Sequence, residues 1–355
     1  MKDVKTLYST PGSFGAGSGK SCKSTPYHKG KSFGYQVLGF GSGGDSGPAF
    51  VEATGGNASF TVGDYKIHVF TGDGNLCVTS QGTEAGNNKI DYLVIAGGGG
   101  GGPATGGGGG GGGYRESQAP GASPVWTASP IATCASLTCF GEGALPVTVG
   151  AGGATFNPSG PTPSQRGANS VFSGITSTGG GAGGSPHTGS PSPGGAAWQP
   201  GGSGGGAGYG ASGFGLGNTP PVSPAQGQNG GPGSPTTGGG GGGALNAAPG
   251  ITGGGGASTT IAPSAYGEPS CATYWYSGGG GGGTDQDPGR GGGGGAGGKG
   301  GGGRGGDRHP GGPNPRQGEA GDANTGGGGG GLGLPTPGTG NNGGSGIVVI
   351  RYKYQ

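Results

Sequence analysis

The sequence predicts a mainly irregular and β fold, in which a small antiparallel β base carries a bundle of polyglycine-II helices, with essentially no α-helix. Three observations support this prediction. Of the 355 residues, 111 are Gly and 29 are Pro, whereas ordinary globular proteins contain roughly 7% and 5%. The glycines fall in long unbroken runs, a density at which an α-helix is disfavoured. Two apolar strand patterns bracket these runs, Tyr92–Ala96 and Ile347–Tyr352.

The composition restricts how such a chain can be stabilised. Only 27% of the residues are apolar and 9% are charged, so little apolar surface is available to offset the entropy lost on ordering. Simple disorder is therefore an alternative, although disordered chains are typically rich in charge and this one is not. Any fold must depend on backbone hydrogen bonds. The net charge of +2 indicates no strongly charged partner.

Residues 1–50 are predicted to be an irregular attachment segment that docks onto another protein. They are polar, with glycines and single aromatic residues scattered through them. The N-terminus lacks the apolar core of a secretory signal, and no apolar run is long enough for a membrane-spanning helix. We therefore expect the protein to stay inside its cell or to leave it as part of an assembled particle.

Residues 51–96 are predicted to form a small β unit. Short strand patterns recur about every ten residues and are separated by Gly, Asp and Asn turns, which favours antiparallel pairing. The expected strands are Ser59–Val62, Tyr65–Phe70, Asn75–Thr79 and Ile90–Ala96. A closing strand is expected within residues 347–355.

Residues 97–346 are predicted to form the glycine-rich bundle with displayed loops. The runs cover residues 97–102, 106–113, 179–181, 238–243, 253–256, 278–283, 291–295 and 326–331. Loops rich in Pro, Ser, Thr and Asn separate them. A β island, defined as residues 146–176, interrupts the series with the patterns Pro146–Gly152, Asn169–Ser173 and Ile175–Thr176.

Glycine runs of this kind can be flexible linkers, but runs of similar length separated by turn residues are typical of stacked repeats. The extended left-handed helix has three residues per turn and a rise of about 3.1 Å. Without side chains, neighbouring helices can approach until their backbones hydrogen-bond sideways. Collagen needs glycine only at every third position, whereas a helix surrounded by neighbours needs it on all faces. The unbroken runs favour the second arrangement, with the strands and the β island as its nucleus.

No pattern of residues indicates an enzyme, so no catalytic residue, metal or cofactor is expected. Gly15–Ser21 is similar to a phosphate-binding loop, but it lacks the first glycine and the flanking strand and helix. The histidines have no partner at metal-ligand spacing. The close pairs Asp285 with Asp287 and Asp307 with His309 lie in glycine-rich loops, where they are more readily explained as turn residues.

Two further features concern partners and redox state. Residues 290–308 place arginine and lysine among glycines, as in segments that bind single-stranded nucleic acid. They lack interleaved aromatic residues and a strong basic excess, so we expect no nucleic-acid partner. The five cysteines show no metal-ligand spacing, and free thiols in a reducing cytosol are expected. Whether Cys134 and Cys139 bridge a short loop stays open.

Aromatic residues between the glycine runs are the candidate binding residues. They could stack on a sugar face or a receptor loop. The alternative is that they cap the bundle and shield its ends. The candidates are Trp126, Trp198, Tyr209, Phe214, Tyr266, Tyr274, Trp275 and Tyr276.

The order of the motifs resembles the glycine-rich domain of bacteriophage tail proteins, over about residues 60–352. The matching pieces are Tyr92–Gly102, Thr148–Gly153, Asn169–Gly184 and Gly343–Tyr352. Related tail-fibre-tip adhesins fold as sandwiches of polyglycine-II helices whose loops carry receptor specificity. The resemblance therefore implies a virion tail protein that acts at the host surface, where its loops recognise a glycan or an outer-membrane protein. Residues 1–50 would then attach it to other tail or fibre proteins.

Two other classes of function remain open at the level of sequence. The bundle could be a rigid spacer in a virion or in an extracellular filament. It could also be an ice-binding protein, although no long flat face of Thr and Ala recurs at regular spacing. The sequence does not decide whether the chain forms a homo-oligomer.

Overall fold

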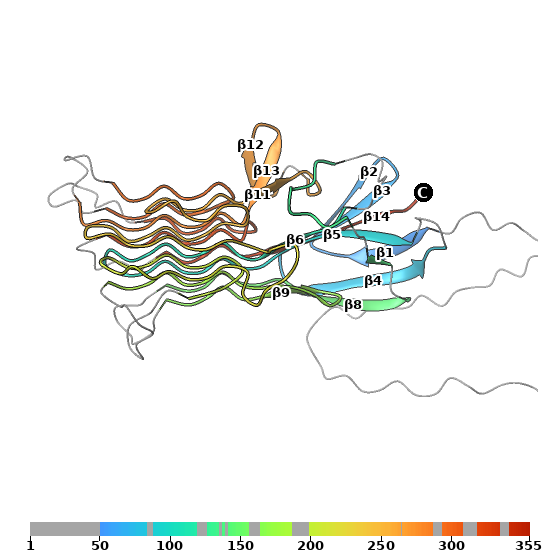
Figure 1. Ribbon diagram of the computed structural model, residues 1–355. Helices are drawn as coiled ribbons and strands as arrows, with labels where there is room; N and C mark the ends of the chain where they lie inside the picture. Colours follow the sequence, from blue (N-terminus) through green and yellow to red (C-terminus); the bar gives the residue numbers. More distant parts are fainter. Residues whose placement is uncertain are drawn as a thin grey trace, which may run out of the picture.

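The chain folds into a β base at one end and a bundle of extended glycine-rich segments at the other (Figure 1). This computed structural model describes residues 50–83, 88–118, 126–134, 137–138, 141–155, 164–186, 199–263, 265–286, 293–307, 318–333 and 341–355. The attachment segment predicted for residues 1–50 lies outside this part of the chain, apart from Phe50. Within the described ranges there is no α-helix, and so none that could cross a membrane.

Two antiparallel sheets form the base. The first has the order β1-β4-β8-β9-β10, with β1 Val51–Gly55, β4 Gly74–Gln81, β8 Gly143–Thr148, β9 Ser170–Phe172 and β10 Ile175–Ser177. The second has the order β2-β3-β14-β5-β6, and β7 pairs with β5. Its strands are β2 Ala58–Val62, β3 Tyr65–Phe70, β14 Ile347–Lys353, β5 Lys89–Ile95, β6 Tyr114–Glu116 and β7 Leu137–Thr138.

The strand that closes the chain lies at the centre of the second sheet. β14 pairs antiparallel with β5 on one side and with β3 on the other, so that Val349 lies opposite both Leu93 and Val69. The two strands that bracket the glycine runs in sequence are thus direct neighbours in the base. Both faces of this sheet are covered, which explains why β14 reads as a continuous apolar run rather than an alternating one.

Apolar side chains fill the space between the two sheets and also cover the outer face of the second sheet. Phe70, Leu76 and Phe172 belong to the cluster between the sheets and are at most 1% exposed. The outer cluster includes Ile347 and Val349 from β14. A third, small sheet closes over it, with the order β11-β13-β12. Its strands are β11 Ala257–Thr259, β13 Thr273–Tyr276 and β12 Glu268–Ser270.

Residues 106–113 show how the bundle is held together. Successive backbone N–H groups donate to three different neighbouring segments, and every third residue donates to the same segment. Gly107 donates to Gly184 and Gly110 to Gly181; Gly108 donates to Gly239 and Gly111 to Gly242; Gly109 donates to Gly329 and Gly112 to Gly326. Their carbonyl groups accept from three further segments, through the N–H groups of Gly99, Gly206 and Gly280. This repeat of three residues is that of the polyglycine-II helix. Six neighbours surround the run, so the predicted polyglycine-II bundle is confirmed.

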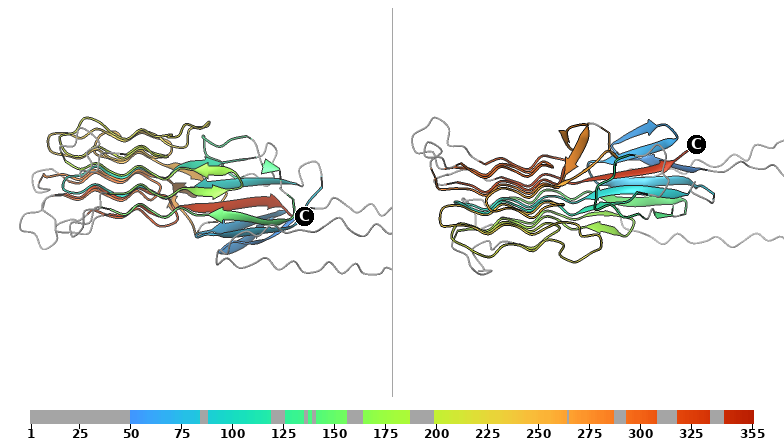
Figure 2. Two further views of the ribbon diagram at one scale, coloured as in Figure 1. Left: turned by 90° about the horizontal axis from the view of Figure 1, so that it is seen from below. Right: turned by 45° about the horizontal axis from the view of Figure 1, so that its top comes forward.

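The position of a segment in the bundle determines whether it tolerates side chains. A Cβ added at Gly109 would overlap the carbonyl oxygen of Gly99, and one added at Gly280 would overlap that of Gly329. On the flank, in contrast, Gln165 and Arg166 are exposed. Most of the described glycines in the long runs are buried in segments enclosed by others, which Figure 2 shows running side by side in layers.

The structure distributes the predicted β segments differently from the sequence prediction. The strands expected as one unit within residues 51–96 are divided between the two sheets. The β island is present as β8, β9 and β10, but these strands extend the sheet that begins with β1 and β4. The segment Tyr274–Tyr276, treated as a loop in the sequence, is part of β13.

The cysteines correct one expectation. Cys134 and Cys271 are free and exposed, so the bridge between Cys134 and Cys139 is not formed. Cys77 is disulfide-bonded, and the expectation that all thiols are free was therefore wrong. Sequence spacing could not decide this, because a disulfide requires Cα atoms about 4.4–6.8 Å apart in the fold.

Candidate functional site

Most of the candidate aromatic residues lie at the junction, which we define as the region where the β11-β13-β12 sheet meets the base and the bundle. Trp126 is 7% exposed and Tyr276 is fully buried, and both belong to the outer apolar cluster of the base. Tyr266 and Tyr274 are half-buried against the same cluster. Packing, which the sequence left open as the alternative to binding, accounts for the placement of these four side chains.

A buried carboxylate connects the segments of the junction. Glu116 is 2% exposed and accepts hydrogen bonds from the Tyr114 hydroxyl at 2.8 Å and the Ser129 N–H at 2.9 Å. The hydroxyl of Thr259 and the indole of Trp126 donate to its other oxygen. Burial raises the pKa of Glu116, while these hydrogen bonds act in the opposite direction. The carboxylate is enclosed and satisfied, as a structural group is.

The Arg351 side chain from β14 is held between two aromatic rings. Its guanidinium lies 3.7 Å from the ring centroid of Tyr65 and 4.1 Å from that of Trp126. Arg351 is 3% exposed, so this stacking takes place away from water, where a cation over an aromatic face is most strongly stabilised. The contact covers one face of the Trp126 ring, and only 7% of Trp126 is exposed to solvent.

Trp275 lies on the opposite face of β13 from Tyr276. The Lys299 ammonium is 5.5 Å from its ring centroid. Glu268, which lies opposite Trp275 on the neighbouring strand β12, accepts hydrogen bonds from the N–H groups of Gly300 and Gly301. Trp275 is thus half-buried between the β12–β13 hairpin and the turn of the bundle that contains Gly300 and Gly301. This region is part of the junction, where the small sheet meets the bundle in Figure 1.

Turns from distant parts of the sequence meet at the end of the bundle opposite the base. The run 97–102 starts where β5 ends, so residues 103–105 lie at the far end. Further turns join them through hydrogen bonds: Tyr209 N–H to Thr105 O (3.1 Å), Gly210 N–H to Ser234 O (3.0 Å) and Asp285 N–H to Thr236 O (3.1 Å). We define residues 103–105, 208–211, 234–237 and 284–286 as the far-end surface. Its side chains are mainly polar.

The far-end surface contains one of the candidate aromatic residues, the half-buried Tyr209. Phe214 is half-buried in the segment that runs back along the flank, and Trp198 lies outside the described ranges. The sequence prediction missed the polar members Thr236 and Gln286, whose side chains are hydrogen-bonded to each other at 2.9 Å. The sequence contained a signal that could have predicted this surface. Successive glycine runs of a bundle alternate in direction, so every second connecting turn lies at the same end.

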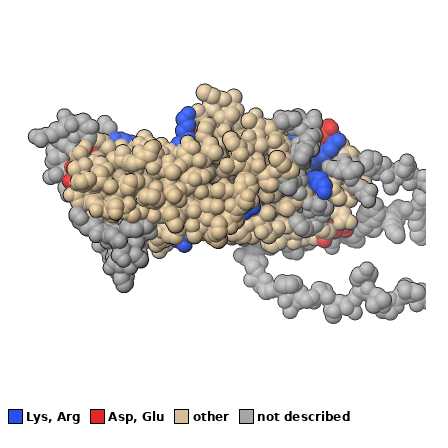
Figure 3. Space-filling model, in the orientation of Figure 1, with Lys and Arg blue, Asp and Glu red and all other residues tan. Residues whose placement is uncertain are grey.

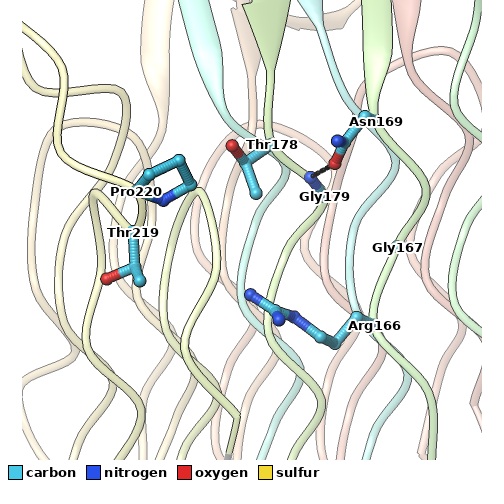
Figure 4. Close-up of a pocket in the computed structure, with 7 residues that line it drawn as sticks. All are labelled: Arg166, Gly167, Asn169, Thr178, Gly179, Thr219 and Pro220. Atoms are coloured by element: carbon cyan, nitrogen blue, oxygen red, sulfur yellow. Dashed lines mark hydrogen bonds between the residues drawn. The ribbon is translucent and has the colours of Figure 1, made fainter.

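A groove of about 390 Å³ lies on the flank of the bundle, close to the base (Figure 4). It is lined by Arg166, Gly167, Asn169, Thr178, Gly179, Thr219 and Pro220. Asn169 immediately precedes β9 and Thr178 immediately follows β10, so the ends of these strands form one wall. Although Arg166 is exposed, partial burial of its side chain lowers the pKa of the guanidinium. No pattern in the sequence indicated this groove.

Charge is sparse on the surface of the protein. The face shown in Figure 3 is mostly uncharged, with a few Lys and Arg residues scattered along it and charged residues of both signs near the base end. Among the residues that the structure describes, no three His, Cys, Asp or Glu side chains gather where they could hold a metal ion. The surface features that remain are the far-end surface and the flank groove.

Comparison with known proteins yields one match. A family model described as glycine-rich domain matches residues 78–353. No curated protein and no solved structure matches the chain. The matched range begins in β4 and ends at the last residue of β14, so it covers the glycine bundle together with the central strands of the base. The chain therefore belongs to the glycine-rich domain family.

Proposed function

We propose that the chain is a bacteriophage tail-fibre or tail-tip protein that binds a host-surface glycan or outer-membrane protein without catalysis. The contact would be made by loops between the polyglycine-II helices. The observation that carries this proposal is the far-end surface, in which four turns from distant parts of the sequence are hydrogen-bonded into one polar face.

The bundle gives that face a rigid support. Each enclosed glycine run is hydrogen-bonded to several neighbours, so a turn at the far end cannot move without breaking bonds in other segments. Binding sites placed on a rigid scaffold lose little conformational entropy when the ligand binds. The turns can vary in sequence without disturbing the enclosed runs, as a protein adapting to different receptors requires.

The direction of the chain is consistent with an attachment function for residues 1–50. β1 starts at Val51 in the base, so the chain enters the described fold at the end opposite the far-end surface. Attachment to other tail or fibre proteins through residues 1–50 would therefore leave the far-end turns pointing away from the particle.

The proposal is tested by binding of the purified chain to candidate host cells, with Tyr209→Ala and Trp198→Ala as variants of candidate contact residues. Leu216→Ala is the control, because it removes an exposed apolar side chain that is not a candidate contact from the flank of the same bundle. We expect at least one of the two variants to lose most of the binding while the control retains it. Each variant is first shown to unfold at the same temperature as the wild type.

If the wild-type chain binds no plausible host cell but assembles into tails or filaments, receptor binding is wrong and the bundle is a spacer. Immunogold labelling of purified phage particles would locate the chain independently, and its absence from the tail would contradict the virion assignment.

A further inference from the structure

The flank groove has two walls that are held in fixed positions. On one side, the amide oxygen of Asn169 accepts a hydrogen bond from the Gly179 N–H at 2.9 Å. On the other side, Asn218 fastens the loop 217–226: its side-chain oxygen accepts from the N–H groups of Val222 and Gln226 at 3.1 and 3.2 Å.

Gln226 connects the two walls. It is fully buried, its amide nitrogen donates to the Pro220 carbonyl at 3.1 Å, and its amide oxygen accepts from the Thr178 N–H at 2.8 Å. The groove is therefore formed before any ligand arrives, and a ligand would not have to order either wall.

The side chains in the groove offer hydrogen-bonding groups that the protein does not use. Within the described ranges, no hydrogen bond engages the Arg166 guanidinium, the Thr178 hydroxyl or the amide nitrogen of Asn169. Neither of the two ion pairs in this part of the chain involves Arg166. Figure 4 shows Arg166 extending from one side of the groove towards the space between Thr178 and Thr219.

These groups define the chemistry of a ligand. A guanidinium presents two parallel donors that match a carboxylate, and such charge-assisted pairs are among the stronger hydrogen bonds in proteins. The hydroxyl and amide groups beside it suit a ligand with several hydroxyls, and the ring of Pro220 offers an apolar surface to C–H groups. The volume of about 390 Å³ lies within the range of small-molecule sites.

We propose that this groove binds an acidic saccharide, with Arg166 pairing with the sugar carboxylate and Asn169 and Thr178 bonding to its hydroxyls. The site lies on the flank close to the base, away from the far-end surface. It does not depend on the chain being a tail protein.

The test is calorimetric binding of the full chain to a trisaccharide that ends in glucuronate, compared with the same trisaccharide ending in glucose. We expect binding of the acidic sugar, at least about tenfold weaker binding of the neutral sugar, and weakening with added salt. Arg166→Ala should lower the affinity for the acidic sugar by about tenfold or more, and Arg166→Lys by less, because lysine retains the charge without the paired donors.

Two matched variants separate this site from the rest of the molecule. Gln165→Ala changes the exposed neighbour of Arg166 and should leave the affinity unchanged. Tyr209→Ala, which tests the far-end surface, should also leave it unchanged, so the two proposals can fail separately.

Three results would overturn the assignment. The first is no binding of the acidic sugar by the wild-type chain, and the second is equal affinity for the two sugars. The third is displacement of the sugar by an equal concentration of inorganic phosphate, which would make the groove a simple anion site.

Discussion

The base and the bundle are stabilised in opposite ways. The interior of the base consists of side chains such as Leu76, Phe172 and Ile350, all fully buried. The interior of the bundle consists of backbone, with each enclosed glycine run bonded to its neighbours at N···O distances of about 2.7–3.2 Å. The hydrophobic effect stabilises the first region, whereas in the second the backbone groups are satisfied between segments instead of within a helix or a sheet.

This difference predicts opposite responses to mutation. In the base, removing a side chain should be harmful, because it leaves a cavity. In the bundle, adding a side chain should be harmful, because it separates the segments whose backbones bond. The base should therefore be sensitive to smaller side chains, and the bundle to larger ones.

The largest effect is expected for Gly109→Ala. Its Cβ would overlap the Gly99 carbonyl oxygen, and the shift needed to relieve this would disturb the hydrogen bonds to Gly329 and from Gly280, both 2.8 Å long. We expect a loss of about 5 kcal/mol or more in the free energy of unfolding, enough to prevent folding of an ordinary domain. Denaturant unfolding or the yield of soluble protein measures it.

A matched glycine in the base provides the control. A Cβ added at Gly72 would meet no atom within 4 Å, so Gly72→Ala should change the free energy of unfolding by less than about 1 kcal/mol. Equal effects of the two substitutions would contradict the account of the bundle.

A somewhat smaller effect is expected in the base for Phe172→Ala. The ring is fully buried between the two sheets, and such truncations cost about 3–5 kcal/mol. A second truncation in the same cluster, Leu76→Ala, should cost about 2–5 kcal/mol. Denaturant unfolding measures both, and a loss below about 1 kcal/mol would show that side-chain packing does not stabilise the base.

At the junction, Glu116→Gln should destabilise by about 1–3 kcal/mol, because its amide cannot accept all the hydrogen bonds that Glu116 accepts. The pH dependence follows from the raised pKa of Glu116. Above the ordinary value of 4.5 the unfolded chain releases this proton first, so wild-type stability falls as pH rises, until the folded pKa is passed.

Glutamine does not titrate at this position, so the stability difference between wild type and variant should shrink as the pH rises from 4.5. Unfolding measured at several pH values tests this. A difference that grows with pH would show that the hydrogen bonds outweigh burial and that the pKa is lowered.

The smallest effect is expected on the flank of the bundle. Leu216 is 58% exposed, so Leu216→Ser should change the free energy of unfolding by no more than about 0.5 kcal/mol. Compared with Gly109→Ala, it tests whether a change of side chain matters less on the flank than a change inside the bundle. A large loss would mean that the flank segments are covered by another part of the protein or by a second copy.

The sequence was sufficient to predict the architecture but not the pairing of its parts. The apolar runs of β5 and β14 identified the centre of the base, and unbroken glycine identified the enclosed segments. β1 and β6 were missed because short strands are formed by their neighbours more than by their own residues. The β island joined the first sheet because β8 pairs with β4, a contact between residues about 70 positions apart.

The candidate site was less predictable for a physical reason. Trp126 and Tyr276 fit a binding loop and a packed core equally well in sequence, because large aromatic residues serve in both. What distinguishes them is their partners, Arg351 for Trp126 and a fully enclosed position for Tyr276. The flank groove depends on three segments that meet only in the fold, and no local pattern marks it.

The central claim is that backbone hydrogen bonds alone hold the enclosed glycine runs in place. Amide hydrogen exchange at Gly108–Gly112, compared with that at Val348–Ile350 in β14, tests it most directly. The account predicts that the glycine amides exchange as slowly as those of the central strand. Exchange at the rate of an unstructured chain would contradict it, and would make the glycine runs flexible linkers.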